Sequence, residues 1–124
     1  MIFLDTHVAV WLFENNLKPF TPTGLQLVKE NELRISPMAI LELSYLFEIK
    51  RIRHSAEQIC DALTRDVGLK IDETPFAQVV ETACTLTWTR DPFDRLIVAQ
   101  AMRNDAPLLT KDETLRNGYK GGIW

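Results

Sequence analysis

The sequence predicts an α/β fold, a three-layer sandwich in which helices cover both faces of a mainly parallel central sheet. Short apolar runs typical of buried strands alternate along the chain with longer segments that begin at helix-start signals. No linker, repeat or low-complexity stretch interrupts this alternation. The chain has 124 residues, of which 46% are apolar and 25% charged, as in one globular domain. We therefore expect a single domain over residues 1–124.

The first half of the chain is expected to hold two strands and three helices. The strands are short apolar runs of the kind that a parallel sheet buries, over residues 2–4 and 33–35. The helices are expected over 7–13, 25–32 and 37–52. Thr6 is the expected N-cap of the first helix. Ser36 followed by Pro37 is a strong start for the third, with serine at the cap and proline at the first helical position.

The second half repeats the alternation. Strands are expected over 69–71 and 107–110, and helices over 55–66, 75–87, 91–104 and 112–117. Ser55 and Asp91 are the expected caps of two of these helices, and Thr74 followed by Pro75 repeats the cap-and-proline signal. Residues 119–124 are expected to add an edge strand, which a pair of glycines weakens.

Composition excludes several classes of protein. The net charge of −3 argues against a protein that coats nucleic acid by electrostatics alone. Cys60 and Cys84 form no C-x-x-C pattern and are interpreted as small buried apolar side chains. His7 and His54 lack metal-ligand spacing, which disfavours zinc. No apolar run approaches the ~20 residues of a membrane helix, so we expect a cytoplasmic protein.

Four acidic residues stand beside apolar runs: Asp5, Glu42, Asp94 and Asp112. In an open parallel sheet the carboxyl ends of the strands face one crevice, where ligands bind. Carboxylates gathered there repel one another unless a cation lies between them. The pattern therefore predicts a divalent-metal site, and hard oxygen ligands suit Mg²⁺, or alternatively Mn²⁺, better than zinc.

Glu42 is the acid that is hardest to explain structurally. At helical spacing its neighbours are Ala39, Leu46 and Ile49, so it lies in an apolar stripe where an unpaired carboxylate is costly. A metal ion would compensate for this burial. A buried salt bridge to Lys50 or to an arginine is the alternative.

Asp94 shares a predicted helix face with Ile97, Val98 and Ala101. Its spacing from Asp91 also imitates a capping box, and both acids would favour the positive end of the helix. We interpret Asp91 as mainly structural and Asp94 as mainly functional. Asp5 and Asp112 have a structural alternative as turn or N-cap residues. The remaining acids considered are interpreted as surface charges: Asp61, Asp66, Asp72, Glu73 and Glu81.

These residues resemble the motifs of the PIN domain, specifically those of VapC-type toxins of bacterial and archaeal toxin–antitoxin pairs. The motifs fall in the family's order over essentially the whole chain, at residues 4–8 with 11–12, 36–43, 90–101 and 108–113. The stretch Arg-Asp-Pro-Phe-Asp-Arg from Arg90 is the most specific of them. Thr89 stands where relatives often have a histidine, which removes a local histidine role but leaves the acidic set complete.

The resemblance implies a PIN-like, metal-dependent endoribonuclease that hydrolyses RNA phosphodiester bonds as the toxin of such a pair. The residues that match the family's acidic ligands are Asp5, Glu42, Asp94 and Asp112. Those expected to support the ligands are Thr6, Asp91 and Thr110, and those expected to hold the RNA backbone are Arg90, Arg95 and Lys111. The implied partners are RNA, a VapB-like antitoxin that blocks the acids, and a second copy of the chain.

Two other functions fit parts of the pattern. A receiver-type phosphorylation switch has a similar length and uses magnesium, and Asp72, Thr110 and Lys111 fit its strand-end positions. It requires paired acids after the first strand, where only Asp5 is present, and it leaves Glu42 unexplained. A non-catalytic interaction module is the other alternative, and it gives the acidic set nothing to stabilise it.

Overall fold

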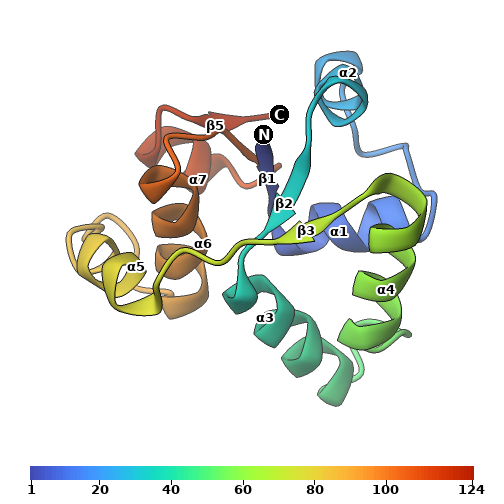
Figure 1. The fold of residues 1–124 in the computed structure, drawn as a ribbon, viewed down its shortest axis with the longest axis horizontal. Helices are drawn as coiled ribbons and strands as arrows, with labels where there is room; N and C mark the ends of the chain where they lie inside the picture. The colour runs from blue at the N-terminus through green and yellow to red at the C-terminus, as the bar shows by residue number, and fades with distance from the viewer.

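A computed structural model describes residues 1–124 and contains one five-stranded sheet (Figure 1). Every neighbouring pair of strands is parallel, in the order β3-β2-β1-β4-β5. The strands are β1 (Ile2–Leu4), β2 (Leu33–Ile35), β3 (Lys70–Ile71), β4 (Leu108–Leu109) and β5 (Gly122–Ile123). The predicted parallel sheet is confirmed, and the weakly predicted last strand pairs with β4.

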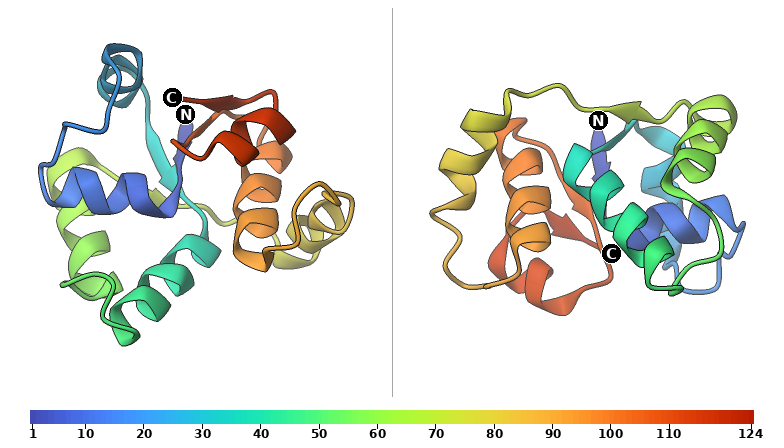
Figure 2. Two further views of the ribbon diagram at one scale, coloured as in Figure 1. Left: turned by 180° about the vertical axis from the view of Figure 1, so that it is seen from behind. Right: turned by 90° about the horizontal axis from the view of Figure 1, so that it is seen from below.

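Seven helices surround the sheet: α1 (Thr6–Phe13), α2 (Pro22–Glu30), α3 (Pro37–Glu48), α4 (Ala56–Val67), α5 (Phe76–Ala83), α6 (Pro92–Arg103) and α7 (Glu113–Gly118). Figures 1 and 2 show α1 and α4 on one side of the sheet and α5 and α6 on the other. Helix α3 leaves the carboxyl end of β2 and contacts α1 and α4 as well as α6. The predicted three-layer arrangement is confirmed.

The sheet is buried because its central strands are apolar on both faces, as parallel strands between helices require. Ile2, Phe3 and Leu4 have no exposed surface, and neither do Leu108 and Leu109. The same core takes in one side of each flanking helix. No helix is both long enough and apolar enough to cross a bilayer.

Two helix starts differ from their predictions. Helix α1 begins at Thr6, and the residue that caps it is Asp5, whose side chain accepts a hydrogen bond from the Thr6 backbone. The prediction of Thr6 as the cap is wrong by one position. Helix α2 begins at Pro22, three residues early, because the Thr21 hydroxyl caps it by accepting from the Gly24 N–H.

Two helices are shorter than predicted. Helix α3 ends at Glu48 because Lys50 takes a left-handed conformation with φ of 62°, which terminates a helix. Helix α5 ends at Ala83, after which the chain turns to bury Leu86. The predicted Thr74 cap is also wrong, because the Thr74 hydroxyl accepts a hydrogen bond from Asn104, the residue that caps the end of α6.

Of the two cysteines, Cys60 is buried as predicted, whereas the prediction that Cys84 is buried is wrong. Cys84 follows the last residue of α5 and lies at the surface.

The topology places a crevice between β1 and β4. After β1 the chain forms β2 and β3, which lie to one side of β1 in the sheet. It later forms β4 and β5, which lie to the other side of β1. The order of the strands therefore reverses at the β1–β4 pair, which is where open α/β sheets bind ligands. Leu4 pairs with Leu109, so the next residues, Asp5 and Thr110, lie side by side. The Asp5 N–H donates to the Leu109 carbonyl at 3.0 Å.

Candidate active site

A cavity of about 300 Å³ opens at this crevice. Five carboxylates and one lysine dominate its wall, and all four predicted ligand residues are present there. The residues that line it are Asp5, His7, Val8, Trp11, Glu42, Asp91, Asp94, Lys111 and Asp112. Residues from β1 to the start of α7 thus meet in one place, which is the convergence that the sequence predicted.

Asp5 is the most firmly held of the acids. It caps α1, with Oδ1 accepting from the Thr6 N–H at 2.8 Å. Its Oδ2 accepts from the Thr110 hydroxyl at 2.6 Å. Burial raises the pKa of Asp5, and the hydrogen bonds from Thr110 and Thr6 oppose that rise. Thr110 therefore makes the contact expected of a residue that supports a ligand.

Glu42 reaches the same cavity from the second turn of α3. The Thr6 hydroxyl donates to Glu42 Oε1 at 2.5 Å, so one threonine connects α1 to α3. Burial raises the pKa of Glu42, the Thr6 bond opposes this, and the charge of Asp5 adds to it. The alternative of a salt bridge to Lys50 or an arginine is wrong, because Glu42 takes part in no ion pair.

Asp91 and Asp94 stand at the first turn of α6. Asp91 is the N-cap, and its Oδ1 accepts from the Asp94 N–H at 3.1 Å. Only one of the two hydrogen bonds of a capping box is present, because the Asp94 carboxylate accepts no hydrogen bond in return. Burial, followed by the charges of Asp91, Asp5, Asp112 and Glu42, raises the pKa of Asp94 to about 7. The structural role of Asp91 is confirmed, although Asp91 also lines the cavity.

The structural alternative for Asp112 is confirmed, and its role as a ligand stays a prediction. It caps α7, with Oδ1 accepting from the Leu115 N–H at 3.1 Å, and it lines the cavity. The Asp112 N–H donates to the Thr110 hydroxyl oxygen at 3.0 Å. Thr110 therefore connects Asp112 with Asp5.

The donor set fits a hard divalent cation. The five carboxylates form no ion pair, and Lys111 is the one Lys or Arg in the cavity wall. Oxygen donors in this number suit Mg²⁺ or Mn²⁺. The side chains do not yet form a finished ligand set, because no three acidic, histidine or cysteine groups lie close enough to hold one ion. Rotation of these side chains would be needed for three of them to hold one ion, and the Asp94 carboxylate accepts no hydrogen bond that would oppose it.

Of the basic residues expected to hold RNA, Lys111 lines the cavity. Arg95 does not, because its Nε donates to the Thr89 carbonyl at 2.7 Å and its side chain lines a separate apolar hollow beside α5. Arg90 is exposed and lies outside the cavity wall. The RNA contacts of Arg90 and Arg95 stay predictions.

His7, Val8 and Trp11 also line the cavity, and none of them is among the predicted site residues. A usable signal was present, because His7 and Trp11 are four residues apart and so share a face of the helix that starts at Asp5.

The interpretation of Asp72 as a surface charge is wrong. Asp72 is 3% exposed and follows β3 at the same edge of the sheet. Arg34 donates to its Oδ1 at 3.0 Å, and Gln100 donates to its Oδ2 at 2.6 Å. Asn104 and the Thr74 N–H also donate to Oδ2. The signal that could have found it is the pair of amides, Gln100 and Asn104, which stand four residues apart at the end of α6.

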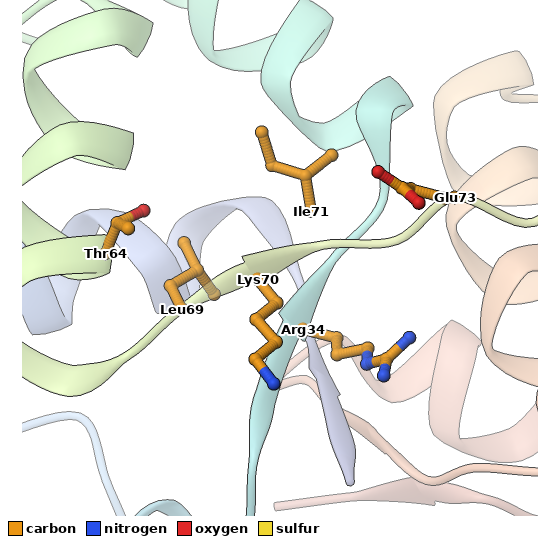
Figure 3. A pocket seen from close by; sticks show the side chains of 6 residues that line it. All are labelled: Arg34, Thr64, Leu69, Lys70, Ile71 and Glu73. Atoms are coloured by element: carbon orange, nitrogen blue, oxygen red, sulfur yellow. The ribbon is translucent and has the colours of Figure 1, made fainter.

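A larger hollow, of about 460 Å³, lies along the outer edge at β3 (Figure 3). Arg34 and Lys70 line it, and Figure 3 shows their side chains on the same side of the strands. Glu32 pairs with both of these cations, and Asp72 pairs with Arg34 as well. Their charges are therefore already compensated, and the acidic cavity is the better candidate site.

The chain belongs to the PIN domain family, whose model matches residues 2–120. It is similar to Ribonuclease VapC22 of Mycobacterium tuberculosis, with 29% identity over 122 residues that cover 94% of this chain and 90% of the relative.

Solved structures of similar fold include VapBC2 from Rickettsia felis bound to a DNA fragment from its promoter. That match has a TM-score of 0.65 at 20% identity and covers 94% of this chain and 92% of the other. VapBC-1 from nontypeable Haemophilus influenzae has a TM-score of 0.62 at 21% identity and covers 100% and 96%. The PIN-like fold predicted from the motifs is confirmed.

Proposed function

We propose that this chain is a Mg²⁺-dependent endoribonuclease of the VapC type, the toxin of a toxin–antitoxin pair, with Mn²⁺ as an alternative ion. The observation that carries the proposal is the cavity at the β1–β4 crevice, where five carboxylates meet with no ion pair among them. The similarity to a protein named a ribonuclease extends over nearly the whole chain, which supports RNA as the substrate.

The residues that would hold the ion are Asp5, Glu42, Asp94 and Asp112. Thr110 orients Asp5, Thr6 orients Glu42, and Asp91 fixes the first turn of α6 that carries Asp94. The chemistry that a divalent ion supplies at such a site is activation of a water molecule and neutralisation of charge on the phosphate.

The chain itself supplies binding and orientation. The Lys111 ammonium is placed to contact a phosphate that enters the cavity, because it lines the same wall as the acids. Asp94, with a pKa of about 7, can gain or lose a proton close to neutral pH. Val8 and Trp11 form the apolar part of the wall and reduce the access of water.

The structure disfavours the receiver-type switch. Phosphorylation requires an accessible acceptor aspartate, and Asp72 is buried in an ion pair and three further hydrogen bonds. A non-catalytic module gives no reason for five acids to share a cavity with one lysine.

A VapB-like antitoxin and a second copy of the chain are the partners that we propose. Exposed apolar side chains stand four residues apart along one side of α3 and on the residue that caps it: Leu41, Tyr45 and Ile49. Tyr45 stacks on Phe93, the residue before Asp94, with the ring centroids 6.0 Å apart. This surface therefore adjoins the acidic cavity, where a bound partner would block access to the acids.

Co-expression with the adjacent antitoxin gene should relieve growth arrest caused by the chain alone.

The central test replaces Glu42 and Asp94, the two cavity acids that do not cap a helix, with their neutral amides. Glu42→Gln and Asp94→Asn should each lower Mg²⁺-dependent cleavage of RNA by orders of magnitude, because each removes an oxyanion from the ion site. Circular dichroism should show an unchanged fold. Cleavage is measured with purified chain on total RNA, with sequencing of the cleaved ends.

The matched control is Asp61→Asn, which neutralises an exposed acid on α4 outside the cavity and should cleave like the parent. Chelation of divalent ions should stop cleavage, and added Mg²⁺ should restore it. Parental activity in both cavity variants would refute the mechanism.

A further inference from the structure

Trp11 lies in the wall of the acidic cavity and has no part in the proposed ion chemistry. It follows His7 by four residues on α1, so both side chains lie on the same face of the helix that starts at Asp5. Lys111 lines the cavity with them. The carboxylates therefore share the cavity with an indole, an imidazole and an ammonium group.

The Trp11 ring is fixed by other aromatic rings. It meets Phe20 edge-on, with centroids 6.2 Å apart and planes at 78°. The Trp124 ring lies 5.8 Å from it, and Trp124 itself stacks on the buried Phe20 at 5.0 Å. Trp11 nevertheless keeps part of its surface exposed. Because packing already orders the ring, little side-chain entropy is lost when a flat ligand stacks on it.

A cation lies over one face of the Trp11 ring. The Lys111 ammonium lies over the Trp11 ring at 6.0 Å from its centroid, the outer limit of a cation–π contact. Stacked planes lie about 3.4 Å apart, which leaves too little room for a base between the indole and the ammonium at 6.0 Å. A base that stacks on this face must therefore displace the Lys111 ammonium, whose flexible stem lets it turn to an adjoining phosphate.

We propose that Trp11 is a stacking platform for one unpaired nucleobase of the RNA strand whose phosphate lies at the carboxylates. This inference rests on the proposed ribonuclease function and deepens it, since it assigns a base-contacting side chain beside the carboxylates. Unstacked bases of single-stranded RNA bind aromatic side chains in this way, with little preference for sequence. Stacking also supplies affinity that a chain of net charge −3 does not obtain from general electrostatic attraction.

The test separates KM from kcat. Trp11→Leu keeps apolar contact with Phe20 and Trp124 but removes the aromatic face. It should raise KM for a short single-stranded oligoribonucleotide by ~10- to ~100-fold while kcat stays at the parental value. Trp11→Phe retains an aromatic face and should recover most of the loss. The matched control is Trp88→Leu, a half-buried tryptophan in a different hollow, beside Gly118, which should keep the parental KM.

A second measurement does not depend on cleavage. Binding of the same labelled oligonucleotide is followed by fluorescence anisotropy in the presence of chelator, and Trp11→Leu should weaken it by a similar factor. A parental KM and a parental dissociation constant in Trp11→Leu would overturn the platform, even where Asp94→Asn abolishes cleavage and the proposed function stands. Conversely, Trp11-dependent binding by a parent chain that cleaves no RNA would support the platform and reject the nuclease.

Discussion

At the scale of single residues, Asp94 is a carboxylate that the folded chain surrounds with acids. Burial and four neighbouring carboxylates raise its pKa to about 7, and it accepts no hydrogen bond in compensation. Asp5 and Glu42 share the cavity but each accepts from a threonine hydroxyl. The chain therefore keeps an unfavourable charge at a position where a cation would stabilise it, which is typical of a functional site.

This environment predicts that removal of the charge stabilises the fold. A raised carboxyl pKa means that Asp94 stays protonated to a higher pH in the folded state than in the unfolded chain. The free energy of unfolding therefore falls as pH rises from about 4 to about 7. In chelator at pH 8, Asp94→Asn should raise the free energy of unfolding by about 1–2 kcal/mol. Solvent screening keeps this gain in the free energy of unfolding below the value that the full pKa shift would give.

Urea titrations at pH 8 and pH 4 measure this effect, and the gain should disappear at the lower pH. Asp61→Asn is again the control, and it should change stability at neither pH. A destabilised Asp94→Asn chain would show that the carboxylate has a structural role.

The same pKa predicts that metal binding depends on pH. Below pH 7 a proton competes with the ion for Asp94, so Mg²⁺ affinity should fall roughly fivefold from pH 7 to pH 6 and level off above pH 8. Calorimetry in two buffers of different ionisation enthalpy measures both the affinity and the proton released. An affinity independent of pH would place Asp94 outside the ion site.

At the scale of elements, Asp72 is the residue that ties β2, β3 and α6 together. Its carboxylate pairs with Arg34 on β2 and accepts from Gln100 on α6 and from Asn104, the residue that caps α6. Gln100 in turn accepts from the hydroxyl of Ser36, which caps α3. The network thus joins the two helices that carry Glu42 and Asp94, from outside the cavity.

Loss of this network should destabilise the fold in a pH-dependent way. Burial works to raise the pKa of Asp72, but its hydrogen bonds and Arg34 outweigh burial and lower it to about 2. A lowered carboxyl pKa stabilises the fold above about pH 4, and the stabilisation is lost as pH falls through about 2. Asp72→Asn should therefore cost about 2 kcal/mol at pH 7.

Chemical denaturation of Asp72→Asn and of the parent from pH 7 towards pH 2 measures this cost, and the two curves should converge at the acidic end. Glu73→Gln changes the exposed neighbouring acid and is the matched control. Equal stability of Asp72→Asn and the parent at pH 7 would contradict the role of the network.

Helix boundaries show what local sequence could and could not specify. The cap-and-proline signals at Ser36 and Asp91 are confirmed, because a side chain and the adjacent turn are enough to form them. Thr74 offered the same signal, yet its hydroxyl accepts from Asn104. A tertiary partner at the end of α6 competes with the local cap, and no pattern within the segment indicates that partner.

At the scale of the whole molecule, the distribution of charge limits how RNA can bind. The chain carries a net charge of −3, and the cavity holds five acids against one lysine. Few phosphates can therefore be neutralised by side chains, and binding should depend on a bound ion and on stacking more than on released counterions.

The dependence of RNA binding on monovalent salt should accordingly be shallow. With one to three phosphate contacts, the slope of log K against log salt for single-stranded RNA should lie between about −0.7 and about −2. Lys111→Gln should reduce its magnitude by about 0.7. Anisotropy titrations over a range of KCl at fixed Mg²⁺ measure the slope, and a steep slope that Lys111→Gln leaves unchanged would reveal a basic surface elsewhere.

The sequence by itself determined the alternation of strands and helices, the family and the acids that converge, because periodicity, caps and motifs are local properties that each segment carries. Only the tertiary structure decided that Asp72 is buried, that Arg95 turns to the Thr89 carbonyl and that Trp11 joins the cavity wall. The physical reason is that burial and pairing depend on which distant segments pack together. That packing is set by the order of the strands, which brings β1 beside β4 from opposite ends of the chain.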